Sequence, residues 1–261
     1  MIQLSPWGLP REVESHTGAP ERVAWPELLY RFGEHLKWEP ARKGQSVAAF
    51  YARMRGHEVP LTFLFSLMLA WASTDTICEL LRAFAVEGDG MEDRGLHLCR
   101  PYDAGYTQPD VCLLSETARV FVELKWSTSI KLDQVQKYLA LHADFDARFG
   151  RRKPYLLFLT REAFGECWRP RRAASDARPA PSFLREIVTE ADRPAKLMAR
   201  LGAGSQRHAG VVDEIGYGFA TWRDVRDALD RIVRRWETVP RAVEAAMIEG
   251  FVADLERRLR G

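Results

Sequence analysis

Two short apolar segments joined by a polar turn, the second carrying a Glu-x-Lys pair, constrain the fold of this chain most. Val111–Leu114 and Val120–Trp126 are rich in β-branched and aromatic residues, and Ser115–Ala118 separates them. This pattern predicts a hairpin of two strands. Because side chains alternate across a strand, Glu123 and Lys125 share one face. An acid and a base therefore lie together on a strand that is otherwise apolar.

Asp110 adds a second carboxylate to this pair. It follows Pro109, which fits the start of a strand, where no amide donor is needed. The predicted hairpin brings its carboxylate close to that of Glu123. Two neighbouring carboxylates repel each other, and a hard divalent cation with oxygen ligands keeps both ionised. The pattern predicts a Mg²⁺ or Mn²⁺ site at Asp110 and Glu123; the alternative is a strand salt bridge between Glu123 and Lys125 that affects stability alone.

The order of these residues resembles a known signature. Pro109-Asp110, a spacer and Glu123-Leu124-Lys125 resemble the PD-(D/E)XK motif of the restriction-endonuclease-like nucleases. The resemblance implies hydrolysis of phosphodiester bonds, mostly in DNA, with Asp110 and Glu123 as metal ligands and the Leu124 carbonyl as an extra ligand. Lys125 would hold the attacking water and the scissile phosphate.

Gln134 and Tyr138 extend the resemblance. They stand four residues apart on a predicted helix, so they lie on one side of it. Their spacing is similar to the Gln-x-x-x-Tyr extension in some branches of the superfamily, which implies that they position water or backbone. A surface amide and a half-buried aromatic side chain are the alternative interpretation.

A further acid is expected on a helix that precedes the strands. Many members of the superfamily carry a helical Glu there, and the segment Glu58-Val59-Pro60-Leu61-Thr62 resembles the start of such a helix. Glu79 competes with it, on a following helix with Thr74 and Asp75 as N-caps. We expect Glu58 to complete or support the site, because Glu79 is readily explained as an exposed helix residue.

The expected elements give an α/β fold with a mixed sheet flanked by helices. They are a buried helix over 61–71, strands over 94–100, 111–114, 120–126 and 154–160, and a helix over 131–149 before the last strand. The resemblance implies a restriction-endonuclease-like core at 56–165. An arm with helices at 28–36 and 42–54 precedes it within residues 1–55. Residues 166–261 are predicted to extend the same domain with a basic loop, helices at 183–201, 222–236 and 239–259, and an edge strand within 210–220.

The charge distribution predicts a polyanionic partner. The net charge is only +2, but Arg148 to Arg178 holds nine basic residues against three acidic ones. A local excess of positive charge suits nucleic acid, and a solvated basic loop is the alternative. The expected binding residues are Arg148, Arg151, Arg152 and Lys153.

The remaining expectations concern location and partners. The four cysteines form no Cys-x-x-Cys pair, no secretion signal is recognised, and the most apolar run, 59–72, is shorter than the ~20 residues that span a bilayer. We therefore expect a reduced cytoplasmic protein that binds no membrane. A nuclease in restriction, phage defence or repair, acting as a homodimer or with a defence-complex partner, fits the resemblance, and a non-catalytic nucleic-acid-binding or assembly module on the same fold is the alternative.

Overall fold

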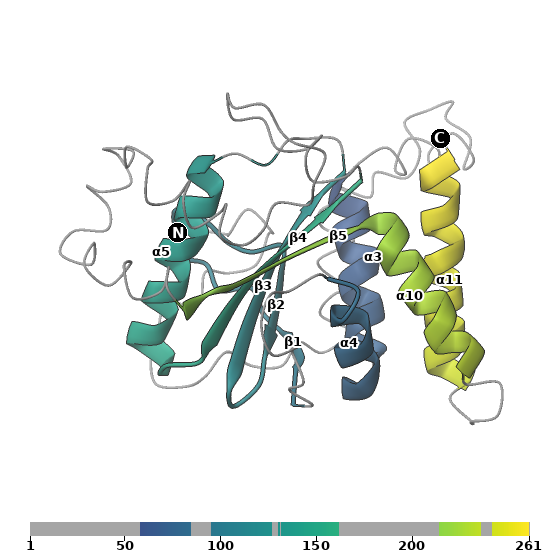
Figure 1. Cartoon of the computed structure of the whole chain (residues 1–261), viewed down its shortest axis with the longest axis horizontal. Coiled ribbons are helices and arrows are strands. Elements are labelled where there is room, and N and C mark those ends of the chain that lie inside the picture. Colours follow the sequence, from purple (N-terminus) through teal and green to yellow (C-terminus); the bar gives the residue numbers. More distant parts are fainter. Residues whose placement is uncertain are drawn as a thin grey trace, which may run out of the picture.

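The computed structural model describes residues 58–84, 95–126, 130, 132–161, 214–235 and 242–260. Within them a mixed sheet of five strands runs in the order β1-β2-β3-β4-β5 (Figure 1). The strands are β1 (His97–Cys99), β2 (Val111–Leu114), β3 (Ala118–Lys125), β4 (Lys153–Thr160) and β5 (Gly216–Thr221). The first three strands pair antiparallel, and β3, β4 and β5 pair parallel. The predicted α/β fold with a mixed sheet is confirmed.

The β2–β3 hairpin forms as the sequence predicts, with one difference in length. Strand β3 begins at Ala118, two residues before the predicted start. The Ser115 backbone N–H donates to the Ala118 carbonyl at 2.9 Å, and the Ser115 hydroxyl accepts from the Ala118 N–H at 2.8 Å. The turn is therefore tight enough for Ala118 and Arg119 to join the strand. Arg119 can be buried there because it has charged and polar partners on a helix, which are described below.

Helix α5 (Leu132–Phe149) connects β3 to β4. Because β3 and β4 are parallel, α5 must run antiparallel to both, and it covers one face of the sheet (Figure 1). Strand β4 is buried on both faces except at Lys153, as its continuous apolar sequence predicts. The predicted crossover is confirmed within one residue at each end.

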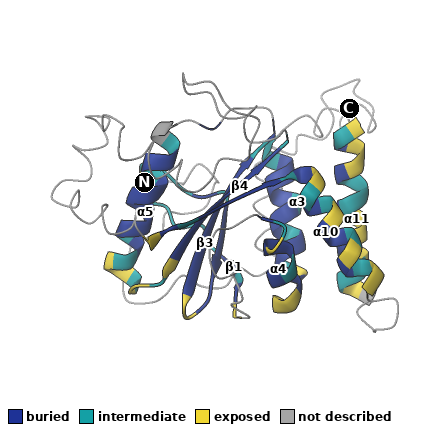
Figure 2. Ribbon diagram, viewed as in Figure 1, coloured by how far each residue is buried: buried dark blue, intermediate teal, exposed yellow. Residues whose placement is uncertain are grey.

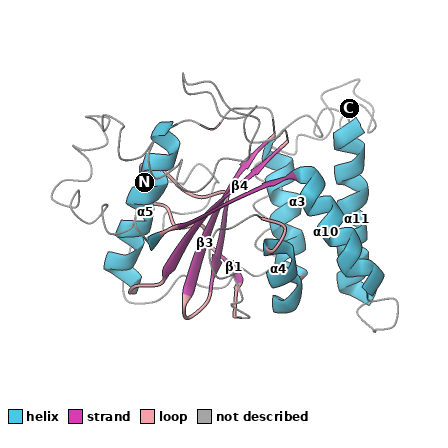
Figure 3. Cartoon of the chain, viewed as in Figure 1, coloured by secondary structure: helices cyan, strands magenta, loops and turns pink. Residues whose placement is uncertain are grey.

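The other described helices lie on the opposite side of the sheet (Figure 3). They are α3 (Glu58–Trp71), α4 (Thr74–Leu81), α10 (Trp222–Arg235) and α11 (Ala242–Arg260). Their apolar side chains pack with those of β3 and β4, and the strands between the two helical layers are almost entirely buried (Figure 2). These side chains form one hydrophobic core, and a second hydrophobic core lies between the sheet and α5.

The start of α4 differs from the sequence prediction. Its N-cap is Ser73, not Thr74 or Asp75, because the Ser73 hydroxyl accepts from the Thr76 N–H at 3.3 Å. Glu244 of α11 adds a long-range contact, since its carboxylate accepts from the Ser73 N–H at 2.6 Å. The predicted strand over 94–100 is described at 97–99, and the predicted edge strand and two closing helices correspond to β5, α10 and α11. The predictions for residues 1–55 and 183–201 lie outside the described residues.

Candidate functional site

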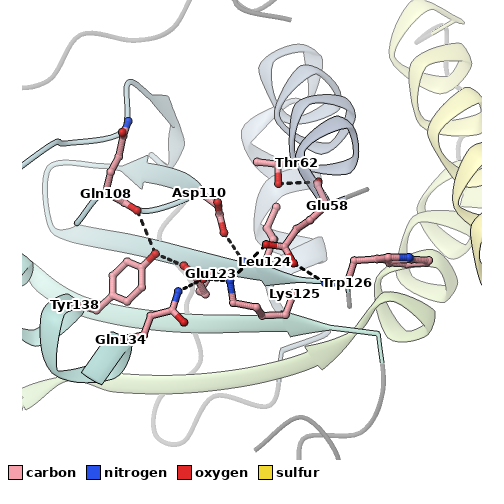
Figure 4. Close-up of polar contacts among 10 residues, drawn as sticks. All are labelled: Glu58, Thr62, Gln108, Asp110, Glu123, Leu124, Lys125, Trp126, Gln134 and Tyr138. Carbon is pink, nitrogen blue, oxygen red and sulfur yellow. Dashed lines mark hydrogen bonds and ion pairs between the residues drawn. The ribbon is translucent and has the colours of Figure 1, made fainter. Parts of the chain in front are cut away.

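The predicted acids and base meet at the carboxyl end of β3 (Figure 4). The register pairs Val111 with Val122, so Asp110, one residue earlier, lies opposite Glu123. The Asp110 carboxylate accepts from the Leu124 backbone N–H at 2.8 Å. Glu123 and Lys125 share a face, as predicted, and form an ion pair. The hairpin thus brings together the three residues of the motif.

Glu123 is the centre of this cluster. Its side chain is buried, with 3% of the residue exposed. One carboxylate oxygen contacts the Lys125 ammonium and accepts from the Gln134 amide, and the other accepts from the Tyr138 hydroxyl. The Gln108 carbonyl lies 3.3 Å from the same hydroxyl. Helix α5 therefore contributes both residues of the Gln-x-x-x-Tyr motif to the same acid (Figure 4).

Glu58 reaches the site from the first turn of α3. Its carboxylate accepts from the Trp126 backbone N–H at 2.9 Å and lies 3.4 Å from the Lys125 nitrogen. Glu79 lies elsewhere, where it pairs with Arg82 and Arg235 at 2.7 and 3.0 Å. The structure brings Glu58 into the cluster and leaves Glu79 on the surface of the helical layer.

Burial and repulsion together disfavour two charged carboxylates at this site. Burial, and then the charge of Glu123, hold the pKa of Asp110 well above its ordinary value, although Lys125 opposes the shift. Burial also raises the pKa of Glu123, again against the effect of Lys125. Burial alone lowers the pKa of Lys125, but Glu123 and Glu58 outweigh it and raise the pKa overall. One ammonium therefore faces three carboxylates, and its charge is too small to balance all of them.

The donor set fits a hard divalent cation in kind. Asp110 and Glu123 supply carboxylate oxygens from neighbouring strands, and the Leu124 carbonyl, which the motif adds by resemblance, is a further hard ligand. Among the described residues, however, no three His, Cys, Asp or Glu side chains are grouped as a metal centre. Lys125 also contacts Glu123 directly. A cation here would have to displace the ammonium from that carboxylate and take its other ligands from water or substrate.

The four predicted nucleic-acid-binding residues lie at the other end of the sheet. Lys153 pairs with Ala118 at the start of β3, whereas Phe158 pairs with Glu123, and five residues of strand correspond to ~17 Å. Arg152 donates to the carbonyls of Ser115 and Phe149 at 2.9 and 3.1 Å. It therefore links the hairpin turn to the last residue of α5. Arg151 pairs with Glu214, and the Arg148 guanidinium lies 5.7 Å from the Tyr102 ring. None of these contacts involves Asp110 or Glu123.

Two arginines that were not singled out in the sequence have defined places. Arg161 follows Thr160, which pairs with Lys125, and its guanidinium lies 5.1 Å from the Trp126 ring. The sequence signal for Arg161 was a basic residue directly after the apolar strand over 154–160. Arg119 is fully buried on the same face of β3 as Glu123. The sequence signal for Arg119 was a charged residue at the start of an apolar strand, which indicates that a charged or polar partner packs against that strand.

Comparison with protein-family models, with curated proteins and with solved structures found no match. Within the described residues, no helix is long and apolar enough to cross a bilayer.

Proposed function

We propose that the chain is a metal-dependent nuclease of the PD-(D/E)XK type, which hydrolyses phosphodiester bonds, most often those of DNA. The observation that carries the proposal is the convergence on Glu123 of the charged and polar residues of the motif and its extension. Asp110 lies opposite Glu123, and Lys125, Gln134 and Tyr138 all contact it. The preference for DNA rests on the resemblance of the motif.

In this proposal Asp110, Glu123 and the Leu124 carbonyl hold Mg²⁺ or Mn²⁺, with Glu58 in support. When bound, the cation supplies positive charge to phosphate oxygens and makes water more acidic. Gln134 and Tyr138 fix the orientation of the Glu123 carboxylate, because each donates to one of its two oxygens. The chain thus presents a preorganised pair of acids at the carboxyl end of β3, the central strand of the sheet.

Lys125 is the residue that would act on the reacting groups. Its ammonium is partly exposed at the end of β3 and lies between Glu123 and Glu58. With a cation bound at Glu123, the Lys125 ammonium would orient the attacking water and stabilise charge on the phosphate. Glu58 keeps this side chain near the site, because it also accepts from the adjacent Trp126 N–H.

The test is incubation of the full chain with supercoiled plasmid, linear duplex DNA, single-stranded DNA and RNA, in Mg²⁺, in Mn²⁺ and in EDTA. The informative variant is Glu123→Gln, which keeps the shape of the side chain and removes its charge. The matched control is Asp227→Asn, which changes an exposed acid on α10. We expect cutting that requires metal, persists in the control and is lost in Glu123→Gln. Equal cutting by Glu123→Gln and the parent chain would overturn the proposal.

A second candidate function is a nucleic-acid-binding or assembly module without catalysis. The contact between Lys125 and Glu123 favours it, because the ion pair already neutralises the acid that a metal would need. Calorimetry with Mg²⁺ and Mn²⁺ separates the two functions. Metal binding that is lost in Glu123→Gln supports the nuclease, whereas binding of nucleic acid in EDTA, with no metal uptake and no product, supports the module.

A further inference from the structure

A second polar cluster lies between α5 and β3, and the proposed chemistry does not use it. Arg119 of β3 donates from its Nε to Nδ1 of His142 at 2.8 Å and forms an ion pair with Asp146. Arg119 and His142 are both fully buried. We refer to Arg119, His142 and Asp146 as the anchor cluster.

Apolar rings enclose the anchor cluster. The His142 ring stacks on Phe121 with centroids 4.3 Å apart, and the Arg119 guanidinium lies 4.8 Å from the Phe145 ring. Among the described residues, Nη2 of Arg119 has no hydrogen-bond partner. A buried cation with an incomplete set of partners is costly, so its retention in a core strand calls for a role beyond packing.

The spacing of the two clusters matches along the helix and the strand. Arg119 and Glu123 are four residues apart on one face of β3, which corresponds to ~13 Å. Tyr138 and Asp146 are eight residues apart on α5, which corresponds to ~12 Å. Because α5 runs antiparallel to β3, Tyr138 meets Glu123 while Asp146 meets Arg119. The helix is therefore held to the strand by polar contacts at both ends.

An apolar interface alone would define this position poorly. Sliding α5 by one turn, ~5.4 Å, would exchange one apolar ridge for another and would carry Tyr138 away from Glu123. The same slide would separate Asp146 from Arg119 and leave a buried guanidinium without its counter-ion, which is strongly unfavourable. The anchor cluster thus penalises the one displacement that would dismantle the candidate site.

We infer that the anchor cluster sets the register of α5 on β3 and thereby positions Gln134 and Tyr138 on Glu123. Its members are positioning residues, since the cluster lies about 13 Å along the strand from Glu123 and acts on it only through α5. The inference deepens the proposed function, on which its consequence for cleavage depends. Its structural claim can be tested without any turnover.

The test observes Tyr138 in a chain labelled with ¹³C at the ring carbon that bears the hydroxyl of tyrosine. Tyr138→Phe identifies the signal, and Glu123→Ala gives its position when the hydrogen bond to Glu123 is lost. The informative variants are Arg119→Met and Asp146→Ala. Asp146→Ala is expected to fold, because the Asp146 side chain is 22% exposed and its removal leaves little buried space unfilled. The matched control is Arg258→Met, which breaks another buried Arg–Asp contact, with Asp254 on α11.

We expect the Tyr138 signal in both anchor variants to move at least halfway to its position in Glu123→Ala, and to stay in place in Arg258→Met. In a chain that cleaves DNA, kcat should fall about tenfold or more at nearly constant KM, because a small misplacement of a catalytic group is expensive. An unmoved signal in folded Asp146→Ala, or an equal movement in Arg258→Met, would overturn the inference. The resonance result decides this whether or not the chain proves to be a nuclease.

Discussion

Lys125 is the residue whose surroundings most restrict what the candidate site can do. It provides the cation in a cluster with Asp110, Glu123 and Glu58, and these acids raise its pKa above the ordinary value despite burial. The side chain therefore stays protonated at neutral pH. A permanent ammonium can orient phosphate and water, but it cannot act as a general base.

Replacing Lys125 with Ala should lower DNA cleavage by a factor of about 10² to 10³, since one preorganised positive group near the reacting phosphate is lost. The fold should persist, because the side chain lies at the end of the strand. Initial rates on plasmid and circular dichroism measure the two effects. Arg234→Ala is the matched control, because this exposed cation lies on α10. Similar rates for the two variants would contradict the assignment.

His142 should make the stability of the fold sensitive to mild acid. Burial, and then the charge of Arg119, hold the pKa of His142 well below its ordinary value of 6.5. Arg119 from β3 and Asp146 from its own helix are the charged groups of its cluster. The unfolded chain takes up a proton below pH 6.5 that the folded chain refuses, so stability is complete above that pH and declines below it.

The expected decline from His142 approaches ~1.4 kcal/mol per pH unit below pH 6. It is measured as the free energy of unfolding in urea between pH 5 and 8, for the parent chain and for His142→Gln, which retains an acceptor for Arg119. The other histidines are common to both chains and cancel in the difference. The difference should favour the variant increasingly as the pH falls. Parallel curves would show that His142 is protonated in the folded state.

At the scale of elements, helix capping connects segments that are remote in sequence. One carboxylate oxygen of Glu244 on α11 accepts from the Ser73 N–H and from the Thr76 hydroxyl, both at 2.6 Å. Ser73 is also the N-cap of α4. A negative charge at a helix N-terminus is stabilising in its own right. The start of α4 is therefore completed by a helix about 170 residues later in the chain.

Glu244→Ala should destabilise the fold by ~1.5–3 kcal/mol, the typical loss for hydrogen bonds to a charged group. Urea denaturation measures the change. Glu249→Ala, an exposed acid on the same helix, is the matched control and should change stability by less than ~0.5 kcal/mol. Equal effects of the two substitutions would mean that the cap contributes nothing to folding.

The sequence predicted those elements whose pattern is local. The bounds of the strand Val111–Leu114 were predicted correctly, because its residues are all buried and apolar. Helix α5 was predicted because its apolar residues follow helical spacing. Glu58 and Glu79 could not be separated with certainty, since each precedes or enters an apolar helix. Only the packing of α3 against the end of β3 brings one of them to Lys125.

The position of the basic residues relative to the acids could have been predicted from the sequence. Arg151, Arg152 and Lys153 were predicted to bind nucleic acid, and their position relative to the acids was not predicted. A parallel crossover returns the chain to the start of the preceding strand, so residues just before β4 must lie far from the end of β3. The connection rule was sufficient to predict this. The pairing of Arg119 with Asp146 was beyond reach, because it depends on the register of a helix against a strand.

At the scale of the whole molecule, the carboxyl-terminal helices share a core with the strand that carries the site. Ile248, Phe251 and Leu255 of α11 are buried in the same cluster as Val122 and Leu124 of β3. The Phe251 ring lies 5.8 Å from Phe65 of α3 and 6.3 Å from Trp222 of α10. A helix that completes a core in this way should unfold together with it.

Hydrogen exchange followed by mass spectrometry tests this cooperativity. Amides in the middle of α11 and in β3 should exchange with the same free energy of opening, which should also equal the global value from urea denaturation. Phe251→Ala should lower all three by ~3–5 kcal/mol, because it leaves a cavity among three helices. If α11 instead opened far more easily than β3, and a chain ending at residue 236 remained folded, α11 would be a separable addition. The fold around the site on β3 would then not depend on α11.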